Sequence, residues 1–392
     1  MLVVGVLAVM PTSATAAAWG IQPTPNPPAA TSSQLLGVSC PSASACTAVG
    51  AYATSSILGA SLAERWNGST WEIQPTPNPA PGDGSNDSLD AVSCASTSAC
   101  MAVGFSDVAG ASTLAESWNG STWAIEPTPS LPAGSFGGRL NGVSCPSATD
   151  CVAVGYYENS SSIDVPLAER WNGSTWMIQA TPTPNGSTGS DLNGVSCASL
   201  NACTAVGSIA SGNVFLPISK TLAERWDGST WVIQPTPNPT INGSLPSDAL
   251  NGVSCSSGLL SSGCTAVGDY NSDGNPLTLA ENWNGKTWSV QPTPNPSPPS
   301  NALSVLRAVS CTYGLIAPRC AAVGGQGVFA SSQFAFRRQG LTWTVQPMPL
   351  PPGVVSSVLS GMSCTSATAC TAVGYYLPPT GTSGATFAER YS

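Results

Sequence analysis

The residues of this chain that could carry out chemistry are its carboxylates and cysteines, because the 392-residue sequence contains no histidine. This excludes Ser-His-Asp and Cys-His catalysis, histidine general bases and almost every zinc or copper site. The serines and threonines also have no S-x-x-K partner that would activate them. Catalysis would therefore need two converging carboxylates, as in glycoside hydrolysis.

Fourteen cysteines fall into pairs with none left over. Their spacing is wider than a redox C-x-x-C motif, and a zinc site would need two pairs to converge. We predict disulfides that each close a short loop and contribute about 2 kcal/mol. The predicted pairs are Cys40 and Cys46, Cys94 and Cys100, Cys145 and Cys151, Cys197 and Cys203, Cys255 and Cys264, Cys311 and Cys320, and Cys364 and Cys370.

One segment matches the opening of a calcium loop, D-x-[DN]-x-[DN]-G, with Asp269, Asn271 and Asp273 as the oxygen ligands. Glu281 lies one place beyond the usual closing position, and polar turns commonly have this composition. A looser match spans residues 83–87. Calcium is therefore a candidate ligand, and no cofactor is required.

The first eighteen residues have the form of a signal peptide. An apolar run from Leu2 to Met10 is too short to span a bilayer, and small residues follow it as far as Ala18. We predict a signal peptide over residues 1–18 and one domain over residues 19–392. With its disulfides, the protein is expected to be secreted, extracellular or associated with the cell envelope, with no transmembrane segment in the mature chain.

Charge narrows the class of partner. The sequence holds 11 Lys and Arg against 20 Asp and Glu, and charged residues make up only 8% of it. An acidic, lightly charged surface argues against nucleic acid as a partner. The 42% hydrophobic content is enough for a substantial core despite 40 Gly and 35 Pro.

The chain repeats seven times. The first cysteines of the pairs run from Cys40 to Cys364 in six intervals, an average period of 54 residues, which is typical of a solenoid or a propeller. Each unit contains L-x-G-V-S-C, C-x-A-V-G, L-A-E-R-W and N-G-S-T-W-x-I-Q-P-T-P. These segments are short and rich in valine and aromatic residues, and turn residues separate them. They predict four antiparallel strands per unit, and the prolines of the last segment restrict it to an outer edge.

The two ends of the repeat complete each other. Trp19 carries the fourth-strand signature before the first cysteine pair, whereas residues 387–391 form a third strand with nothing after it. We predict that residues 19–25 supply the outer strand of the last blade and close the ring. The expected fold is all-β, a monomeric seven-bladed β-propeller with four antiparallel strands per blade. An open solenoid would need polar capping repeats, which do not occur here.

The combination V-S-C, C-x-A-V-G, L-A-E-R-W-N-G-S-T-W and Q-P-T-P-N-P resembles secreted bacterial seven-bladed β-propeller repeat proteins, mostly without assigned function. The resemblance covers nearly the whole mature chain. The turn at residues 68–71 also resembles the Asp-box of sialidase-type propellers, but Trp66 stands where the aspartate should be. Sialidase activity is therefore not implied. Kelch repeats are a looser neighbour, because their paired glycines are absent.

Comparison of the seven units separates constant loops from variable ones. The cysteine loops and the N-G-S-T turns are nearly invariant, and antiparallel strands place both on one rim of the ring. The opposite rim carries variable connections, such as residues 53–61 and 79–88, which are either drifting linkers or a binding surface. We predict a binding or interaction module that contacts a protein or glycan there, with Phe136, Tyr157 and Phe215 as loop aromatics for a glycan.

The alternative is a hydrolase or lyase that acts on polysaccharide through carboxylates at the axis of the ring. No pair of carboxylates recurs in a recognisable motif, so no catalytic residue is assigned and an enzyme is not expected. The candidates on the variable rim are Asp83, Asp90, Asp107, Glu158, Asp164 and Asp269.

One carboxylate recurs in the third strand of six units, which is too regular for a single active site. These residues are Glu64, Glu116, Glu169, Glu224, Glu281 and Glu389, and Phe336 replaces them in the sixth unit. We predict a structural role between blades. Because Glu64 and the following Arg65 point to opposite faces of a strand, we hypothesise that each glutamate meets the arginine of a neighbouring blade. Ser117 and Asn282 break the arginine pattern.

Overall fold

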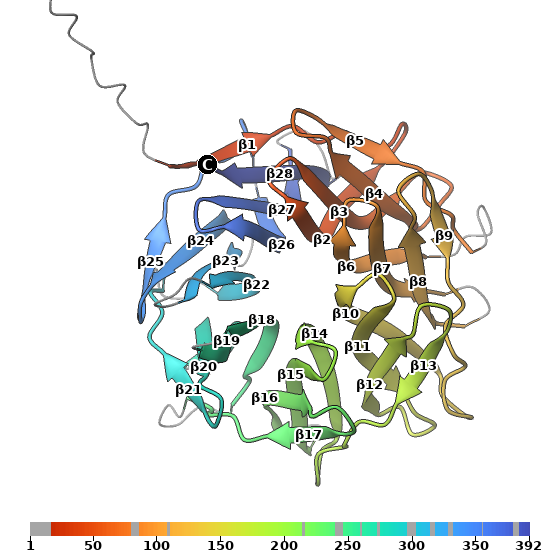
Figure 1. The fold of residues 1–392 in the computed structure, drawn as a ribbon, viewed down its shortest axis with the longest axis vertical. Helices are drawn as coiled ribbons and strands as arrows, with labels where there is room; N and C mark the ends of the chain where they lie inside the picture. Colours follow the sequence, from red (N-terminus) through yellow and green to blue (C-terminus); the bar gives the residue numbers. More distant parts are fainter. Residues whose placement is uncertain are drawn as a thin grey trace, which may run out of the picture.

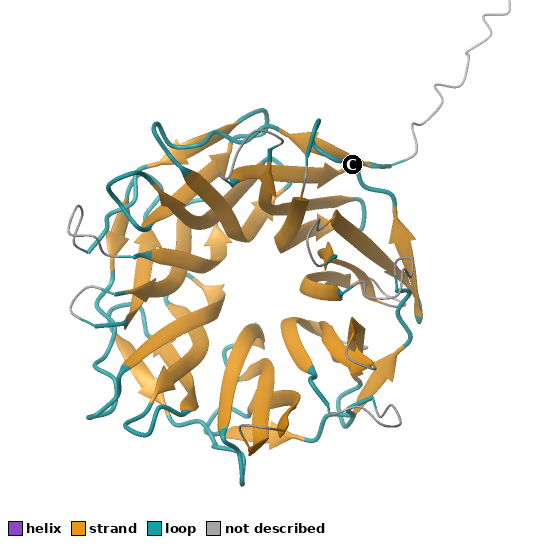
Figure 2. Ribbon diagram, turned by 180° about the vertical axis from the view of Figure 1, so that it is seen from behind, coloured by secondary structure: helices purple, strands orange, loops and turns teal. Residues whose placement is uncertain are grey.

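The structure is a computed structural model that describes residues 17–79, 86–107, 110–213, 216–239, 246–258, 261–272, 275–295, 303–313, 318–327, 332–354, 356–378 and 384–392. In these residues twenty-eight strands form seven four-stranded antiparallel sheets. The sheets stand as blades around a central axis (Figure 1). Figure 2 shows the same ring from behind, with strands making up each blade and loops at its periphery. The predicted seven-bladed propeller is confirmed.

Within each blade the strands run from the axis outward in chain order. The first blade is β2 (Ser32–Ser42), β3 (Ala45–Ala53), β4 (Ala60–Trp66) and β5 (Trp71–Gln74); the second is β6 (Ser88–Ser96), β7 (Ala99–Ser106), β8 (Ser112–Trp118) and β9 (Trp123–Ile125). The third is β10 (Gly137–Ser147), β11 (Asp150–Glu158), β12 (Asp164–Trp171) and β13 (Trp176–Gln179); the fourth is β14 (Gly189–Ser199), β15 (Ala202–Asn213), β16 (Leu216–Trp226) and β17 (Trp231–Gln234). The fifth is β18 (Ala249–Gly258), β19 (Ser261–Ser272), β20 (Asn275–Trp283) and β21 (Trp288–Gln291); the sixth is β22 (Ser304–Tyr313), β23 (Pro318–Gln326), β24 (Ser332–Gln339) and β25 (Thr342–Gln346). The seventh is β26 (Ser356–Ser366), β27 (Ala369–Leu377), β28 (Ala385–Tyr391) and the N-terminal strand β1 (Trp19–Gln22).

The N-terminal strand closes the ring, as predicted. Strand β1 pairs antiparallel with β28, and Trp19 lies opposite Tyr391 in the register. Their ring centroids are 5.5 Å apart, and both residues belong to the core of the seventh blade. This arrangement covers an edge that would otherwise be free to pair with another chain.

Replacement of Trp19 by alanine is therefore expected to lower the free energy of unfolding by about 3–5 kcal/mol. The substitution removes a buried aromatic side chain where β1 and β28 close the ring without a covalent connection between them. Denaturant unfolding followed by circular dichroism measures this cost. Ile125→Ala in β9 is the control, since Ile125 is 39% exposed on another outermost strand. Equal stability of the two variants would contradict closure by β1.

The inner strands pack so closely at the axis that the third residue of the L-x-G-V-S-C segment must be small, and it is glycine or alanine in all seven units. A Cβ atom on Gly37 of β2 would lie 2.9 Å from the Cα of Ala91 in β6. One on Gly142 of β10 would lie 3.0 Å from the Cα of Gly194 in β14. The repeated small residue is thus explained by the approach of neighbouring backbones.

All seven predicted disulfides are present, and each joins the first two strands of a blade. Gly68, in the turn after β4, has a φ of 100° and lies against Ser44 in the cysteine loop of the same blade. Cysteine loops and Asn-Gly turns therefore share one rim, which we call the disulfide rim. On the opposite rim, Gly59 pairs with Asn86 of the crossover that leads into the second blade. We call this the crossover rim.

The tryptophans that flank the Asn-Gly and Asp-Gly turns pack against each other. In five blades the two rings lie 5.7–5.9 Å apart in a tilted arrangement, and these pairs are Trp66–Trp71, Trp118–Trp123, Trp171–Trp176, Trp226–Trp231 and Trp283–Trp288. Because each of these tryptophans is at least nine-tenths buried, the pairs are chiefly packing elements.

The Q-P-T-P-N-P segment completes the outer edge of a blade by side-chain hydrogen bonds. In the first blade, Thr76 donates to the carbonyl of Ser61 at 2.9 Å, and the Asn78 side chain accepts from the Ser61 amide at 2.8 Å. Threonine and asparagine thus satisfy the backbone of β4 where the prolines cannot extend the ladder.

The six repeated glutamates are fully buried between blades. Three of them accept a hydrogen bond from the third strand of the preceding blade: Glu64 from Thr386, Glu169 from Thr113 and Glu389 from Gln333. Among the described residues the ion pairs are instead Arg139–Asp90 and Arg170–Asp150. The hypothesis of glutamate–arginine pairs is therefore wrong, and the glutamates meet neutral polar side chains.

Four arginines at the position after the repeated glutamate contact the next blade through cation–π stacking. The Arg65 guanidinium lies 4.8 Å from the centre of the Trp118 ring, and the Arg65 side chain also donates to the Thr97 carbonyl in the next cysteine loop. The same stacking joins Arg225 to Trp283, Arg337 to Tyr391 and Arg390 to Trp66. Arginine therefore links neighbouring blades on their disulfide side.

Candidate functional site

A groove on the crossover rim lies between the second and third blades. It has a volume of about 570 Å³, and its walls are the connection before β8 and the crossover from β9 to β10. It is lined by Gly110, Ala111, Ser112, Thr113, Thr128, Pro129, Ser130, Leu131, Ser135, Phe136 and Gly137. Hydroxyl groups and backbone thus make up most of its polar wall.

Phe136 is the large aromatic of this groove and is 61% exposed. The crossover presents it through a turn in which the Ser135 amide donates to the Pro132 carbonyl, while Gly134 has a φ of 86°. The Phe136 amide then donates to the Glu158 carbonyl at 2.9 Å. The turn and this bond hold the backbone in place, so the ring is displayed from a structured segment.

Beside the groove, toward the axis, the inner strands carry an ion pair. The Arg139 Nε atom lies 2.6 Å from Asp90 of the preceding blade, and the Arg139 guanidinium lies 4.6 Å from the centre of the Phe105 ring. Ser88 donates a further hydrogen bond to Asp90. Burial raises the pKa of Asp90, and Arg139 opposes that rise. The pair joins the second and third blades on the crossover side.

A group of carboxylates surrounds Tyr156 on the third and fourth blades. Burial raises the pKa of Asp164, and the charges of Asp191 and Glu158 raise it further. Burial raises the pKa of Asp191 as well, although Ser208 donates a hydrogen bond to it. These two carboxyls therefore hold their protons more strongly than ordinary aspartates.

The structure brings three of the predicted carboxylates together. Asp90, Glu158 and Asp164 lie around the Arg139–Tyr156 region of the second and third blades. Asp107 is on the same rim but accepts a hydrogen bond from the Asn86 amide. Asp269 lies apart in the fifth blade, and Asp83 lies outside the described residues.

The loop aromatics differ in their surroundings. Tyr157 is half-buried and packs against the core of the third blade, so Phe136 is the more accessible of the two. Phe215 lies outside the described residues.

The candidate calcium segment does not form a loop where it is described. Asp269 and Asn271 are part of strand β19, with Asp269 opposite Thr278 and Asn271 opposite Pro276 of β20. Asp269 accepts a hydrogen bond from Asn251 at 3.3 Å, and burial raises its pKa to about 6. Asp273 lies outside the described residues. No cluster of three Cys, Asp or Glu side chains suited to a metal occurs in the described part of the chain. Calcium binding stays a prediction of the sequence.

Sequence reasoning missed Arg139, Tyr156 and Asp191. Arg139 and Asp191 occupy the position just before the repeated leucine of the inner strand. The other five units carry uncharged residues there, namely Gln34, Ser88, Ala249, Val305 and Val358. Comparison of that single position among the units would have marked the third and fourth blades as different. The motif search passed over it because the position has no fixed residue type.

No protein-family model and no curated protein sequence matches this chain. Solved structures with a similar fold include a protein of unknown function from Dyadobacter fermentans DSM 18053, at 10% identity and a TM-score of 0.54, covering 96% of this chain and 98% of that one. A PL25 ulvan lyase matches at 7% identity and a TM-score of 0.56, covering 91% and 97%. The SapL1 lectin, in complex with alpha methyl fucoside, matches at 15% identity and a TM-score of 0.47, covering 82% and 97%. At these identities the likeness establishes the β-propeller fold alone.

Proposed function

We propose that this protein is an exported binding module whose crossover rim, at the second and third blades, binds glycan. The observation that carries the proposal is the exposed Phe136 ring on a groove of about 570 Å³ whose polar wall is rich in hydroxyl groups. An aromatic face packs against the C–H surface of a sugar ring, while hydroxyl and carbonyl groups bond its oxygens.

The setting of the groove favours a glycan over a flat protein partner. Arg139 lies on the inner strand two residues after Gly137 of the groove, and the Asp164–Asp191 group lies on the third and fourth blades, so a chain of several sugars would meet further polar groups beyond the groove. A protein interface of ordinary size would instead need a broad apolar centre. The variable crossovers of the other blades would determine how far a bound glycan chain can extend along the rim.

Export is the second part of the proposal. Seven disulfides form and persist in an oxidising compartment, and small local loops of this kind are rare in reducing cytosol. In the described residues there is no helix of the length and apolar character that a bilayer crossing requires. The disulfides are thus the observation on which we propose a location outside the cell or at its envelope.

A glycan array followed by titration calorimetry tests the proposal. We expect Phe136→Ala to weaken binding of the recognised glycan about tenfold, because loss of an aromatic contact costs about 1–1.5 kcal/mol. Leu350→Ala is the matched control, since Leu350 is 54% exposed on the crossover that follows the sixth blade. An unchanged affinity in the Phe136 variant, or an equal loss in both variants, would place the glycan elsewhere.

Catalysis on polysaccharide is the alternative, and the grouping of Asp164 with Asp191 and Glu158, whose charges act on one another, favours it. One carboxyl that keeps its proton beside another that has lost it can serve as acid and base. If the protein releases new reducing ends from a bound polysaccharide, and Asp191→Asn abolishes this release, the protein is an enzyme rather than a binding module. Binding without such release would keep the proposal as stated.

A further inference from the structure

Four of the seven interfaces between blades share one pattern on the disulfide side, and the interface between the second and third blades lacks its central residue. In four interfaces an arginine of the third strand stacks on the aromatic residue that ends the third strand of the next blade. Arg65, Arg337 and Arg390 also donate to a carbonyl at the same place in the next cysteine loop, namely Thr97, Ala367 and Ala43. Ring and carbonyl together form a receptor for a guanidinium.

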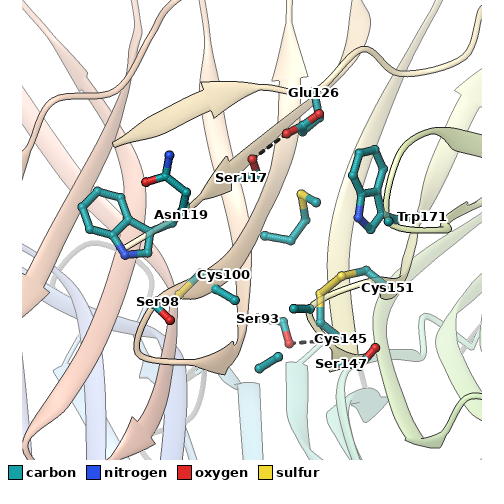
Figure 3. Close-up of a pocket in the computed structure, with 16 residues that line it drawn as sticks. Ser93, Ser98, Cys100, Ser117, Asn119, Glu126, Cys145, Ser147, Cys151 and Trp171 are labelled. Atoms are coloured by element: carbon teal, nitrogen blue, oxygen red, sulfur yellow. Dashed lines mark hydrogen bonds between the residues drawn. A yellow bond between two sulfur atoms is a disulfide. The ribbon is translucent and has the colours of Figure 1, made fainter. Parts of the chain in front are cut away.

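The interface between the second and third blades keeps the receptor and lacks the arginine. Ser117 stands at the arginine position, whereas Trp171 keeps the aromatic position and Ala148 keeps the carbonyl position. A pocket of about 210 Å³ opens there, several times the roughly 30 Å³ that one water occupies in the liquid. Figure 3 shows Ser117 and Trp171 on its two sides, with the Cys145–Cys151 disulfide below.

The charge of this pocket also differs from that of the other interfaces. Glu126 lines it, at a place where the other six units carry glutamine. The Ser117 hydroxyl donates to the Glu126 carboxylate at 2.6 Å (Figure 3). The interface has therefore lost a cation and gained an anion, so it attracts a positive charge where its neighbours already hold one.

The second interface without the arginine is filled from the other side. Asn282 replaces arginine in the fifth blade, but Arg338 of the sixth blade occupies the tryptophan position and donates to Asn282 at 3.1 Å. That exchange restores a buried guanidinium to the interface, since Arg338 is 4% exposed. At the second and third blades Trp171 is retained, and no such exchange has occurred.

We propose that the pocket between Ser117 and Trp171 binds a guanidinium group supplied by a ligand. The group stacks on the Trp171 ring, pairs with the Glu126 carboxylate and donates to the Ala148 carbonyl, as the chain's own arginines do in other interfaces. The ligand is a small guanidinium compound or an exposed arginine side chain of another protein. This site lies on the disulfide rim and does not depend on the glycan site of the crossover rim.

Titration of the full-length protein with agmatine, followed by NMR and calorimetry, tests the site. Ser117→Arg places the chain's own guanidinium in the pocket, so it is expected to abolish agmatine binding and to raise the melting temperature. Glu126→Gln restores the glutamine of the other units and is expected to weaken binding about tenfold or more. An analogue of agmatine in which a neutral urea group replaces the guanidinium is expected not to bind.

The reverse experiment creates the same pocket in the first blade. Arg65→Ser is expected to lower the melting temperature, and millimolar agmatine is expected to recover part of the loss. The double variant Arg65→Ser/Gln74→Glu reproduces the Ser117–Glu126 arrangement, so it is expected to gain a second agmatine site. These gains cannot arise from misfolding, which would abolish binding and stability together.

A capped Gly-Arg-Gly peptide separates the two sources of guanidinium. Binding of the peptide at least as tightly as agmatine assigns the site to arginine side chains of a protein partner, and binding of agmatine alone assigns it to small compounds. Failure of both probes to bind overturns the proposal. Agmatine binding that survives both Ser117→Arg and Glu126→Gln also overturns it.

Discussion

Raising the pH from 5 to 9 is expected to lower the melting temperature of this protein steeply, because six carboxyl groups are buried between its blades. Burial raises the pKa of each of them from the ordinary value of 4.5 to about 8, and hydrogen bonds oppose the rise only in part. In the folded protein these groups therefore keep their protons at neutral pH.

The sign follows from the protons bound by each state. Below pH 4.5 both the folded and the unfolded chain hold the proton, and the full stability is present. Between pH 4.5 and 8 only the folded chain holds it, so each such glutamate lowers the unfolding free energy by up to about 1.4 kcal/mol per pH unit. Above pH 8 the loss is complete. Histidine is absent from the sequence, so no histidine titration contributes in this range.

Calorimetric melting at intervals of one pH unit measures this dependence, and Glu224 offers the sharpest variant. Burial alone raises the pKa of Glu224, and neither of its carboxyl oxygens has a hydrogen-bond partner, whereas a side-chain hydrogen bond opposes the rise in the other five glutamates. Glu224→Gln is expected to match the parent at pH 5 and to exceed its melting temperature at pH 9. A variant that is less stable than the parent at both pH values would contradict a protonated Glu224.

Pro166 explains why Glu224 lacks a partner and supplies the control. It stands where Thr386 and Thr113 stand in the blades that serve Glu64 and Glu169, and proline has no hydroxyl to donate. Pro166→Thr is expected to stabilise the protein by about 1 kcal/mol and to lower the pKa of Glu224. The gain should disappear in the double variant with Glu224→Gln if the threonine acts through the carboxylate.

The fold could be predicted in detail because its determinants are local and repeated. Each unit marks its own turn, its outer edge and its cysteine loop, and the seven copies confirm one another. The closure of the ring by Trp19 could be predicted for the same reason. The N-terminal end carries a fourth-strand motif without the other three strands, and the C-terminal blade lacks a fourth strand.

The partners of the glutamates could not be predicted in the same way. Alternation along β4 shows that Glu64 and Arg65 point to opposite faces, but it does not show which residue of the next blade each one meets. That depends on the offset between sheets that have no hydrogen bonds to each other. The offset places Glu64 beside Thr386 of the preceding blade and Arg65 over Trp118 of the following one.

The two proposed binding sites were harder still to predict from the sequence, because each depends on residues that depart from the repeat. Ser117 was visible as an exception, yet its meaning required the position of Trp171 in the neighbouring blade and the charge of Glu126. The groove at Phe136 depends on the path of a crossover whose sequence has no counterpart in the other units. Repeats reveal their scaffold readily, whereas their binding sites arise from single substitutions.

Reduction of the seven disulfides is expected to unfold the protein near room temperature. Each bridge joins adjacent strands across a separation of six or nine residues, so each restricts the unfolded chain by about 2 kcal/mol. Seven such contributions total about 14 kcal/mol, which is close to the upper end of the roughly 5–15 kcal/mol that typically separates a folded domain from its unfolded state. Loss of circular dichroism at 25 °C, after addition of a phosphine reductant in mild denaturant, measures the effect.

Removal of one bridge at a time tests whether these contributions are independent. The bridges lie in different blades, so paired Cys→Ala substitutions are expected to lower the unfolding free energy in nearly equal, additive steps. Each step should slightly exceed the chain-entropy contribution, because the second cysteine of a pair also packs between blades. Cys46 is 2% exposed and lies 3.6 Å from the Thr371 hydroxyl of the preceding blade, and Cys264 similarly contacts Thr204. A first substitution that unfolded the whole ring would show instead that the blades cannot tolerate the loss of a single local constraint.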